Sequence, residues 1–193
     1  MTTWLNVSRL IDALNSRVGR AVYWLILLMA LVSASNAVVR KLFNLSSNAF
    51  LEIQWYLFAA VFLLNAGHTL LRNQHVRVDI VFGALSSRTR LWIDIMGTIF
   101  FLFPFALIVL YYSWPYFLAS FNIRESSINA GGLSVWPVKL LIPVGFLLLL
   151  LQGVSQLIKL FAALRGEASE DALIEHLSRA QEEVKAVLGD RIL

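Results

Sequence analysis

The sequence contains no cysteine and few charged residues. The absence of cysteine from all 193 residues excludes disulfides, thiolate metal sites and cysteine nucleophiles. Charged residues make up 15% of the chain, compared with about 25% in a typical soluble domain. The deficit is concentrated in long uncharged runs, and hydrophobic residues reach 59% of the total. This composition indicates an integral membrane protein.

Motifs for catalysis and for nucleotide binding are also missing. The sequence has no H-E-x-x-H, no G-x-S-x-G and no phosphate-binding glycine loop, so we expect no enzymatic activity and no catalytic, cofactor or metal site. The formal net charge is +4, but the basic residues lie at the ends of apolar runs and not in one patch. Nucleic acid is therefore not an expected partner.

Four apolar runs are long enough to cross a bilayer, for which a helix needs about 20 residues. The runs cover residues 21–42, 49–71, 91–113 and 138–161. None alternates with a period of two, and backbone groups inside lipid must form hydrogen bonds within their own segment. The sequence thus predicts an all-α integral membrane protein with four transmembrane helices in a membrane domain over residues 21–162. Pro104 is expected to kink the third helix.

The two ends of the chain are less apolar. Residues 1–20 are expected to form an N-terminal interfacial segment, because apolar side chains recur there on one helical face. These side chains are Trp4, Val7, Ile11 and Leu14. Residues 163–193 are expected to form a cytoplasmic tail that contains a C-terminal amphipathic helix over 169–188.

The distribution of basic residues predicts the orientation of the chain. If both termini are cytoplasmic, more of the lysines and arginines near the membrane lie inside than outside, as the positive-inside rule requires. In this orientation the polar stretch LRNQHVRVDI, residues 71–80, lies on the cytoplasmic side. We interpret this stretch as a helix boundary and a membrane anchor, and not as an active site.

Charged residues near the ends of the apolar runs are candidates for specific ion pairs. Glu52 lies one turn into the second run, and Arg40 and Lys41 end the first. We expect Glu52 to pair with one of these two residues, or with a basic residue of a partner subunit. Asp94 follows Arg90 by four residues, which favours a pair along one helix. These charges lie away from the midplane, so we interpret them as structural and not as a site for a transported ion.

Amide side chains on the fourth run indicate a face that is covered by protein. Gln152 and Gln156 lie one turn apart, Gly145 shares their face and Gly153 lies beside it. An amide that faces lipid is unfavourable. Four helices of this length are not expected to cover every such face themselves. We therefore expect an accessory subunit in which Gln152, Gly153 and Gln156 contact a larger membrane protein.

Two other functions remain open from these residues alone. His68 and His75 lie seven residues apart, so a haem- or quinone-associated membrane anchor of a redox complex is one alternative. Their unequal depth argues against a pair of haem ligands. A small transporter that works without a partner is the other alternative, and it would normally show acidic or broken-helix features near the midplane.

Two blocks of the sequence resemble the DctQ-type small membrane subunit of tripartite ATP-independent periplasmic (TRAP) transporters. The first block is AFLEIQWYLFAAVFLLNAGHTLLRNQHVRVDI, residues 49–80, with Glu52 shortly before QWYLF and with HVRVD at its end. The second block is RESSINAGGLSVWPVKLLIPVGFLLLLLQG, residues 124–153. The order and spacing of these pieces, together with the four-helix plan, carry the resemblance over about residues 15–162.

The resemblance implies a function that composition does not. It implies a scaffold subunit in a bacterial inner membrane, supporting a large elevator-type membrane subunit in sodium-coupled import of an organic acid-type solute. A periplasmic substrate-binding protein would deliver that solute. The expected partners are therefore the large TRAP membrane subunit, the binding protein and the lipid bilayer, with no cofactor. The loop that holds Arg124 and Glu125 would lie near the surface where the binding protein docks.

Overall fold

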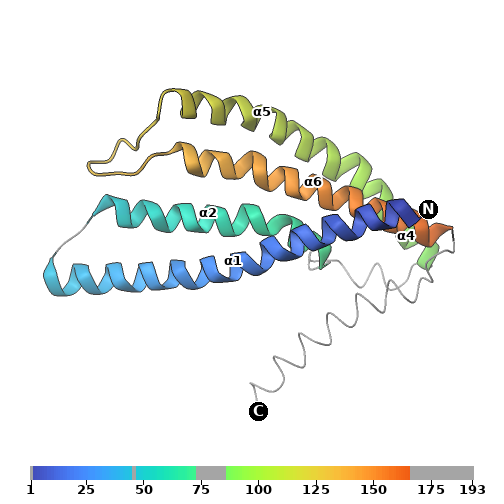
Figure 1. Ribbon diagram of the computed structural model, residues 1–193, viewed down its shortest axis with the longest axis horizontal. Coiled ribbons are helices and arrows are strands. Elements are labelled where there is room, and N and C mark those ends of the chain that lie inside the picture. The colour runs from blue at the N-terminus through green and yellow to red at the C-terminus, as the bar shows by residue number, and fades with distance from the viewer. Residues whose placement is uncertain (1, 45–46, 73–85, 166–193) are drawn as a thin grey trace, which may run out of the picture.

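The computed structural model describes residues 2–44, 47–72 and 86–165, and most of them are helical (Figure 1). The elements are α1 (Thr2–Phe43), α2 (Asn48–Leu71), α4 (Ser87–Gly97), the π-helical turn η1 (Thr98–Leu102), α5 (Phe103–Asn122) and α6 (Trp136–Leu164). Most of the stretch LRNQHVRVDI, and the predicted amphipathic helix of the tail, lie outside the described residues.

Four helical stretches are long and apolar enough to cross a membrane. They are Trp4–Phe43, Asn48–Leu71, Arg88–Asn122 and Trp136–Leu164. Each contains one of the four apolar runs, and apart from an isolated β-bridge the described residues form no β-structure. The prediction of an all-α membrane protein with four spanning helices is therefore confirmed.

The helices form an open row in the order α1, α2, α6, α5 (Figure 1). α2 packs between α1 and α6, and α6 packs between α2 and α5. The first half of α1 crosses the end of α6, so α1 contacts two helices. Because α1 and α5 lie at the two edges of the row, each keeps many large apolar side chains exposed. A bilayer or a partner protein is the environment that such side chains require.

α1 is one continuous helix and not a short interfacial helix followed by a membrane span. Ile11, which we expected on the surface stripe, is buried, whereas Trp4, Val7 and Leu14 are exposed. The difference arises because a polar face of this segment packs on α6. The helix continues through Gly19, where a Cβ would overlap the ring of a histidine on α2. Whether residues 1–20 lie in the membrane interface stays a prediction.

The third spanning stretch changes its hydrogen-bond pattern immediately before Pro104. Phe103 donates its backbone N–H to the carbonyl of Thr98, five residues earlier, which is the π-helical pattern of η1. Pro104 has no N–H to donate and cannot continue a regular helical ladder. The irregularity expected at Pro104 is therefore found in the turn that precedes it.

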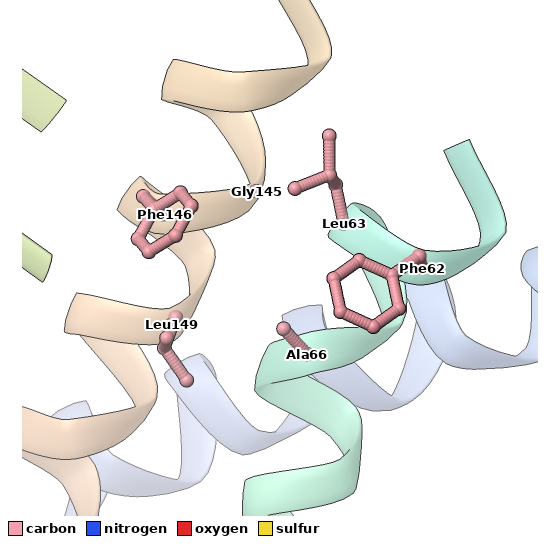
Figure 2. A pocket seen from close by; sticks show the side chains of 6 residues that line it. All are labelled: Phe62, Leu63, Ala66, Gly145, Phe146 and Leu149. Atoms are coloured by element: carbon pink, nitrogen blue, oxygen red, sulfur yellow. The ribbon is translucent and has the colours of Figure 1, made fainter. Parts of the chain in front are cut away.

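The close contact between α2 and α6 depends on Gly145. A Cβ at this position would lie 2.7 Å from the backbone carbonyl oxygen of Leu63. An apolar pocket adjoins this contact, and its lining side chains come from both helices (Figure 2). They are Phe62, Leu63 and Ala66 of α2, and Gly145, Phe146 and Leu149 of α6.

Candidate functional site

Polar side chains gather in two clusters at opposite ends of the helix row. One cluster surrounds Glu52, at the end where α1 stops and α2 begins, and we call this the Glu52 end. The other surrounds Asp12, where the first half of α1 crosses α6, and we call this the Asp12 end. The donors and acceptors of both clusters come from segments that are far apart in the sequence.

Glu52 is only 4% exposed, one turn into α2. Its Oε1 accepts hydrogen bonds from the hydroxyl of Ser127 and from the side-chain amide of Asn129, the latter at 2.8 Å. Its Oε2 accepts the backbone N–H of Leu133 at 2.7 Å. A buried carboxylate needs such donors to replace water, and hydrogen bonds to a charged acceptor are strong. Glu52 therefore binds the segment between α5 and α6 to α2.

This segment, residues 123–135, is a hairpin, which we call the α5–α6 hairpin. Its two arms are joined by a β-bridge between Ser126 and Ser134 and by a hydrogen bond from the Ser127 N–H to the Leu133 carbonyl, at 2.9 Å. At its base, the N–H of Val135 donates to the carbonyl of Glu125 at 2.9 Å. The hairpin is thus ordered by its own backbone as well as by Glu52.

A second contact with α2 supports the hairpin. The side-chain amide of Asn48 donates to the carbonyl of Ala130 at 3.0 Å. Gly132 lies close against the carboxylate, because a Cβ there would be 2.8 Å from Oε1 of Glu52. Gly131 adopts the left-handed backbone conformation, with φ of 71°, which glycine reaches without steric cost. The two glycines therefore allow the chain to turn tightly over the end of α2.

Glu125 and Lys139 form a salt bridge at the base of the hairpin. The Lys139 ammonium also lies 4.1 Å from the centre of the Tyr116 ring, in a cation–π arrangement. The hydrogen bond from Lys139 holds the pKa of the Glu125 carboxyl below its usual value. The neighbouring Arg124 is exposed and has a positive φ of 49°. Of the two hairpin residues expected near a docking surface, Arg124 is thus exposed and Glu125 is paired.

The structure does not place Arg40 or Lys41 against Glu52. Both are exposed in the last turn of α1, where the helix dipole favours positive charge. Among the described residues, Glu52 has the neutral hairpin donors as its partners instead. Sequence reasoning missed these donors because they lie 75, 77 and 81 positions away along the chain. Neutral side chains and a backbone N–H also leave no charge pattern to detect.

At the Asp12 end, α1 and α6 are joined through the carboxylate of Asp12. Its Oδ1 accepts the side-chain amide of Gln152 at 2.9 Å and the hydroxyl of Ser155 at 2.7 Å. Its Oδ2 forms a salt bridge with Lys159. The hydroxyl oxygens of Ser8 and Ser155 lie 2.7 Å apart. These contacts satisfy most of the polar atoms that the crossing of α1 over α6 buries.

Asn15 lies where α1, α2 and α6 meet. Its side-chain amide donates to Oε1 of Gln152 at 2.9 Å. On the other side, a Cβ at Gly67 of α2 would overlap Oδ1 of Asn15. Both Asn15 and Gln152 are almost completely buried, at 0% and 1% exposure. Gln152 therefore connects Asn15 and Asp12 in one network.

The predicted partner contacts of Gln152 and Gly153 need correction, because both residues are buried within their own chain. Gly153 faces the third spanning stretch, where a Cβ would lie 2.9 Å from the ring of Phe103. The amide of Gln152 is covered, as expected, but by Asp12 and Asn15 of α1. Gln156 is half-buried, and its Oε1 has no hydrogen-bond partner among the described residues. Its contact with a partner stays a prediction.

Two further residues from the sequence analysis have defined surroundings. His68 is buried between α1 and α2, where Gly19 leaves space for its ring and Tyr23 lies edge-on to it. His75 lies outside the described residues. Asp94 is half-buried on α4, and its backbone carbonyl accepts the hydroxyl of Thr98 at 2.8 Å. The ion pair of Asp94 with Arg90 stays a prediction.

Residues 29–163 match a family model, that of tripartite ATP-independent periplasmic transporters, DctQ component. No curated protein and no solved structure matches the chain. The match includes both blocks that carry the resemblance, and it extends from the middle of α1 to the end of α6. The DctQ component is part of a transporter and is not an enzyme. The chain belongs to the DctQ family and is the small membrane component of a TRAP transporter.

Proposed function

We propose that this chain is a fixed scaffold for a large elevator-type membrane subunit that imports an organic acid with sodium. The family match over residues 29–163 carries the proposal, because DctQ components function with a large membrane subunit and a periplasmic binding protein. The open helix row supports it. A row with α1 and α5 at its edges offers broad apolar faces to lipid and to a partner, as a scaffold requires.

The exposed small residues of α1 are the surface that we propose for the large subunit. Ala30, Ala34 and Ala37 are exposed, and small side chains let the backbone of another helix approach closely. The adjacent Ser33 already donates a hydrogen bond to Gln54 of α2 at 3.0 Å. The three alanines are therefore displaced from the α2 contact and are free to meet a second protein.

We further propose that both termini are cytoplasmic, in a bacterial inner membrane, with the Glu52 end in the periplasm. Exposed basic residues support this orientation, because more of them lie at the Asp12 end than at the Glu52 end. At the Asp12 end they are Arg9, Arg17, Arg20, Arg72, Arg88 and Arg165. At the Glu52 end they are Arg40, Lys41 and Arg124.

The orientation is testable with single cysteines, because the natural chain has none. Ile128→Cys and Arg165→Cys place exposed thiols beyond opposite ends of α6. A membrane-impermeant maleimide added to cells with a permeabilised outer membrane is expected to label the first variant. It should label the second only after the inner membrane is opened. Labelling of Arg165→Cys alone in closed cells would show the inverted topology.

Transport by the reconstituted system tests the proposed function directly. We expect uptake of labelled carboxylic acids into liposomes to require the large subunit, the binding protein, this chain and an inward sodium gradient. Uptake that persists without this chain would contradict the scaffold role, and uptake that persists when potassium replaces sodium would contradict the coupling.

A pair of alanine variants tests the surface on α1. Ala34→Leu is expected to reduce the amount of large subunit that co-purifies in mild detergent, because the larger side chain holds the partner helix away. Ala119→Leu, at an alanine of α5 that is also exposed, is the matched control and should leave co-purification unchanged. The reverse pattern would place the large subunit on α5.

A further inference from the structure

The tip of the α5–α6 hairpin carries an isoleucine that the described residues of the chain leave uncovered. The two arms are paired through Ser127 and Leu133, so the tip is formed by residues 128–132. Ile128 lies at this tip and is fully exposed. Figure 1 shows the hairpin extending past the ends of both α5 and α6, along the direction of the helices.

The position of two exposed tryptophans supports a location of this tip in water and not in hydrocarbon. Trp55 and Trp114 are exposed, and tryptophan is enriched at the membrane–water interface. Trp55 is seven residues from the start of α2 and Trp114 eight residues from the end of α5, so both lie about 10–12 Å inside the helix ends at 1.5 Å per residue. The hairpin that carries Ile128 extends past the ends of α5 and α6 (Figure 1), and we therefore place this exposed apolar side chain outside the hydrocarbon.

The hairpin is also held in one conformation before any partner arrives. Glu52 accepts three hydrogen bonds from it, and Asn48 contributes a fourth contact at Ala130. These bonds end at Ser127 and Asn129, on either side of Ile128. The backbone on both sides of Ile128 is therefore fixed, while its side chain is uncovered. A loop that is ordered before binding loses little backbone entropy on binding, which favours association.

We propose that Ile128 is a preformed docking knob that inserts into an apolar recess of the soluble binding protein, and that Glu52 is the residue that positions it. This inference rests on the proposed function, in which a binding protein visits the Glu52 end of the complex. The residues next to Ile128 are small or polar, so an incoming surface can close around the side chain. They are Ser127, Asn129, Ala130 and Gly131.

The test measures binding of the solute-loaded binding protein to the complete membrane complex, held in nanodiscs on a sensor. Ile128→Ser is expected to weaken binding about tenfold, as loss of a central apolar contact does. Ile123→Ser is the matched control, because Ile123 is also exposed, at 72%, but lies at the end of α5 and not on the hairpin tip. It should bind like the natural chain.

Glu52→Gln tests the positioning role separately. It keeps the size of the side chain but removes the charge that the three donors stabilise, so the hairpin should loosen and binding should weaken. In the same variant, co-purification with the large subunit should remain at the natural level. The double variant Glu52→Gln with Ile128→Ser should be no weaker than Ile128→Ser alone, because Glu52 acts through the position of that side chain.

Several results would overturn this inference. If the natural complex binds and Ile128→Ser binds equally well, the docking role of Ile128 is wrong, while the proposed function stands. If the natural complex does not bind the protein at all, the proposed partnership fails as well. A bimane label on Ile128→Cys that is quenched by brominated lipid, without binding protein present, would place the tip in the membrane.

Discussion

Replacing Gly145 by leucine is expected to separate α2 from α6 and to lower the unfolding temperature of the chain sharply. The added Cβ would lie 2.7 Å from the carbonyl oxygen of Leu63 and 2.9 Å from its carbonyl carbon. Both atoms belong to the backbone of a helix, so neither can move aside as the end of a flexible side chain can. Overpacking of a tight contact costs about 1–3 kcal/mol and sometimes more, and we expect the upper part of this range.

Gly97→Leu is the matched control for this substitution. Gly97 also lies in a helix, but a Cβ there has no neighbour within 4 Å. Leucine forms helices better than glycine by almost 1 kcal/mol, so the control should match or exceed the natural chain. Thermal unfolding in mild detergent, followed by tryptophan fluorescence, compares the two variants. Equal unfolding temperatures for Gly145→Leu and the natural chain would show that α2 and α6 do not pack as described.

Gln152→Leu is expected to destabilise the chain although it makes the membrane span more apolar. Gln152 donates to Asp12 and accepts from Asn15, so its loss leaves a buried amide and part of a carboxylate without their partner. Leaving a buried polar group unsatisfied costs about 1–3 kcal/mol. A lipid-facing glutamine would give the opposite result, because leucine is better tolerated in hydrocarbon.

Gln156→Leu, one turn further along α6, provides the comparison. Its Oε1 is sheltered and has no hydrogen-bond partner among the described residues, so leucine should leave the unfolding temperature unchanged or raise it. Both variants should be purified as the isolated chain, so that loss of fold is separated from loss of assembly. If the two glutamine variants unfold alike, the network of Asp12, Asn15 and Gln152 contributes nothing to stability.

The position of Gln152 shows how far reasoning from the sequence extends. The rule that an amide in a membrane span avoids lipid depends only on the chemistry of the side chain, and it correctly predicted a covered face on α6. The rule does not say what covers that face. We expected a larger protein because four helices of this length were not expected to cover every such face themselves, whereas the first half of α1 crosses α6 and supplies Asn15 and Asp12.

The partners of Glu52 also differ from those expected from the sequence, but for a different reason. Its place near a helix end predicted a partner for the charge, and Arg40 and Lys41 were the nearest cations along the chain. In the structure the carboxylate is satisfied by neutral donors of the hairpin, among them Ser127 and the N–H of Leu133. A charge can be stabilised by a few aligned dipoles as well as by an opposite charge, so a search for opposite charges alone misses such a site.

The sequence by itself determined the class of the protein, the number of spanning helices and their approximate bounds. These properties depend on the length and polarity of local runs, since each helix satisfies its backbone hydrogen bonds internally. Only the tertiary structure decided the order α1, α2, α6, α5 and the crossing of α1 over α6. It also decided the hydrogen bonds that join the hairpin to Glu52. Those features depend on which surfaces fit, and close contacts such as Gly145 with Leu63 form between segments that have no local pattern in common.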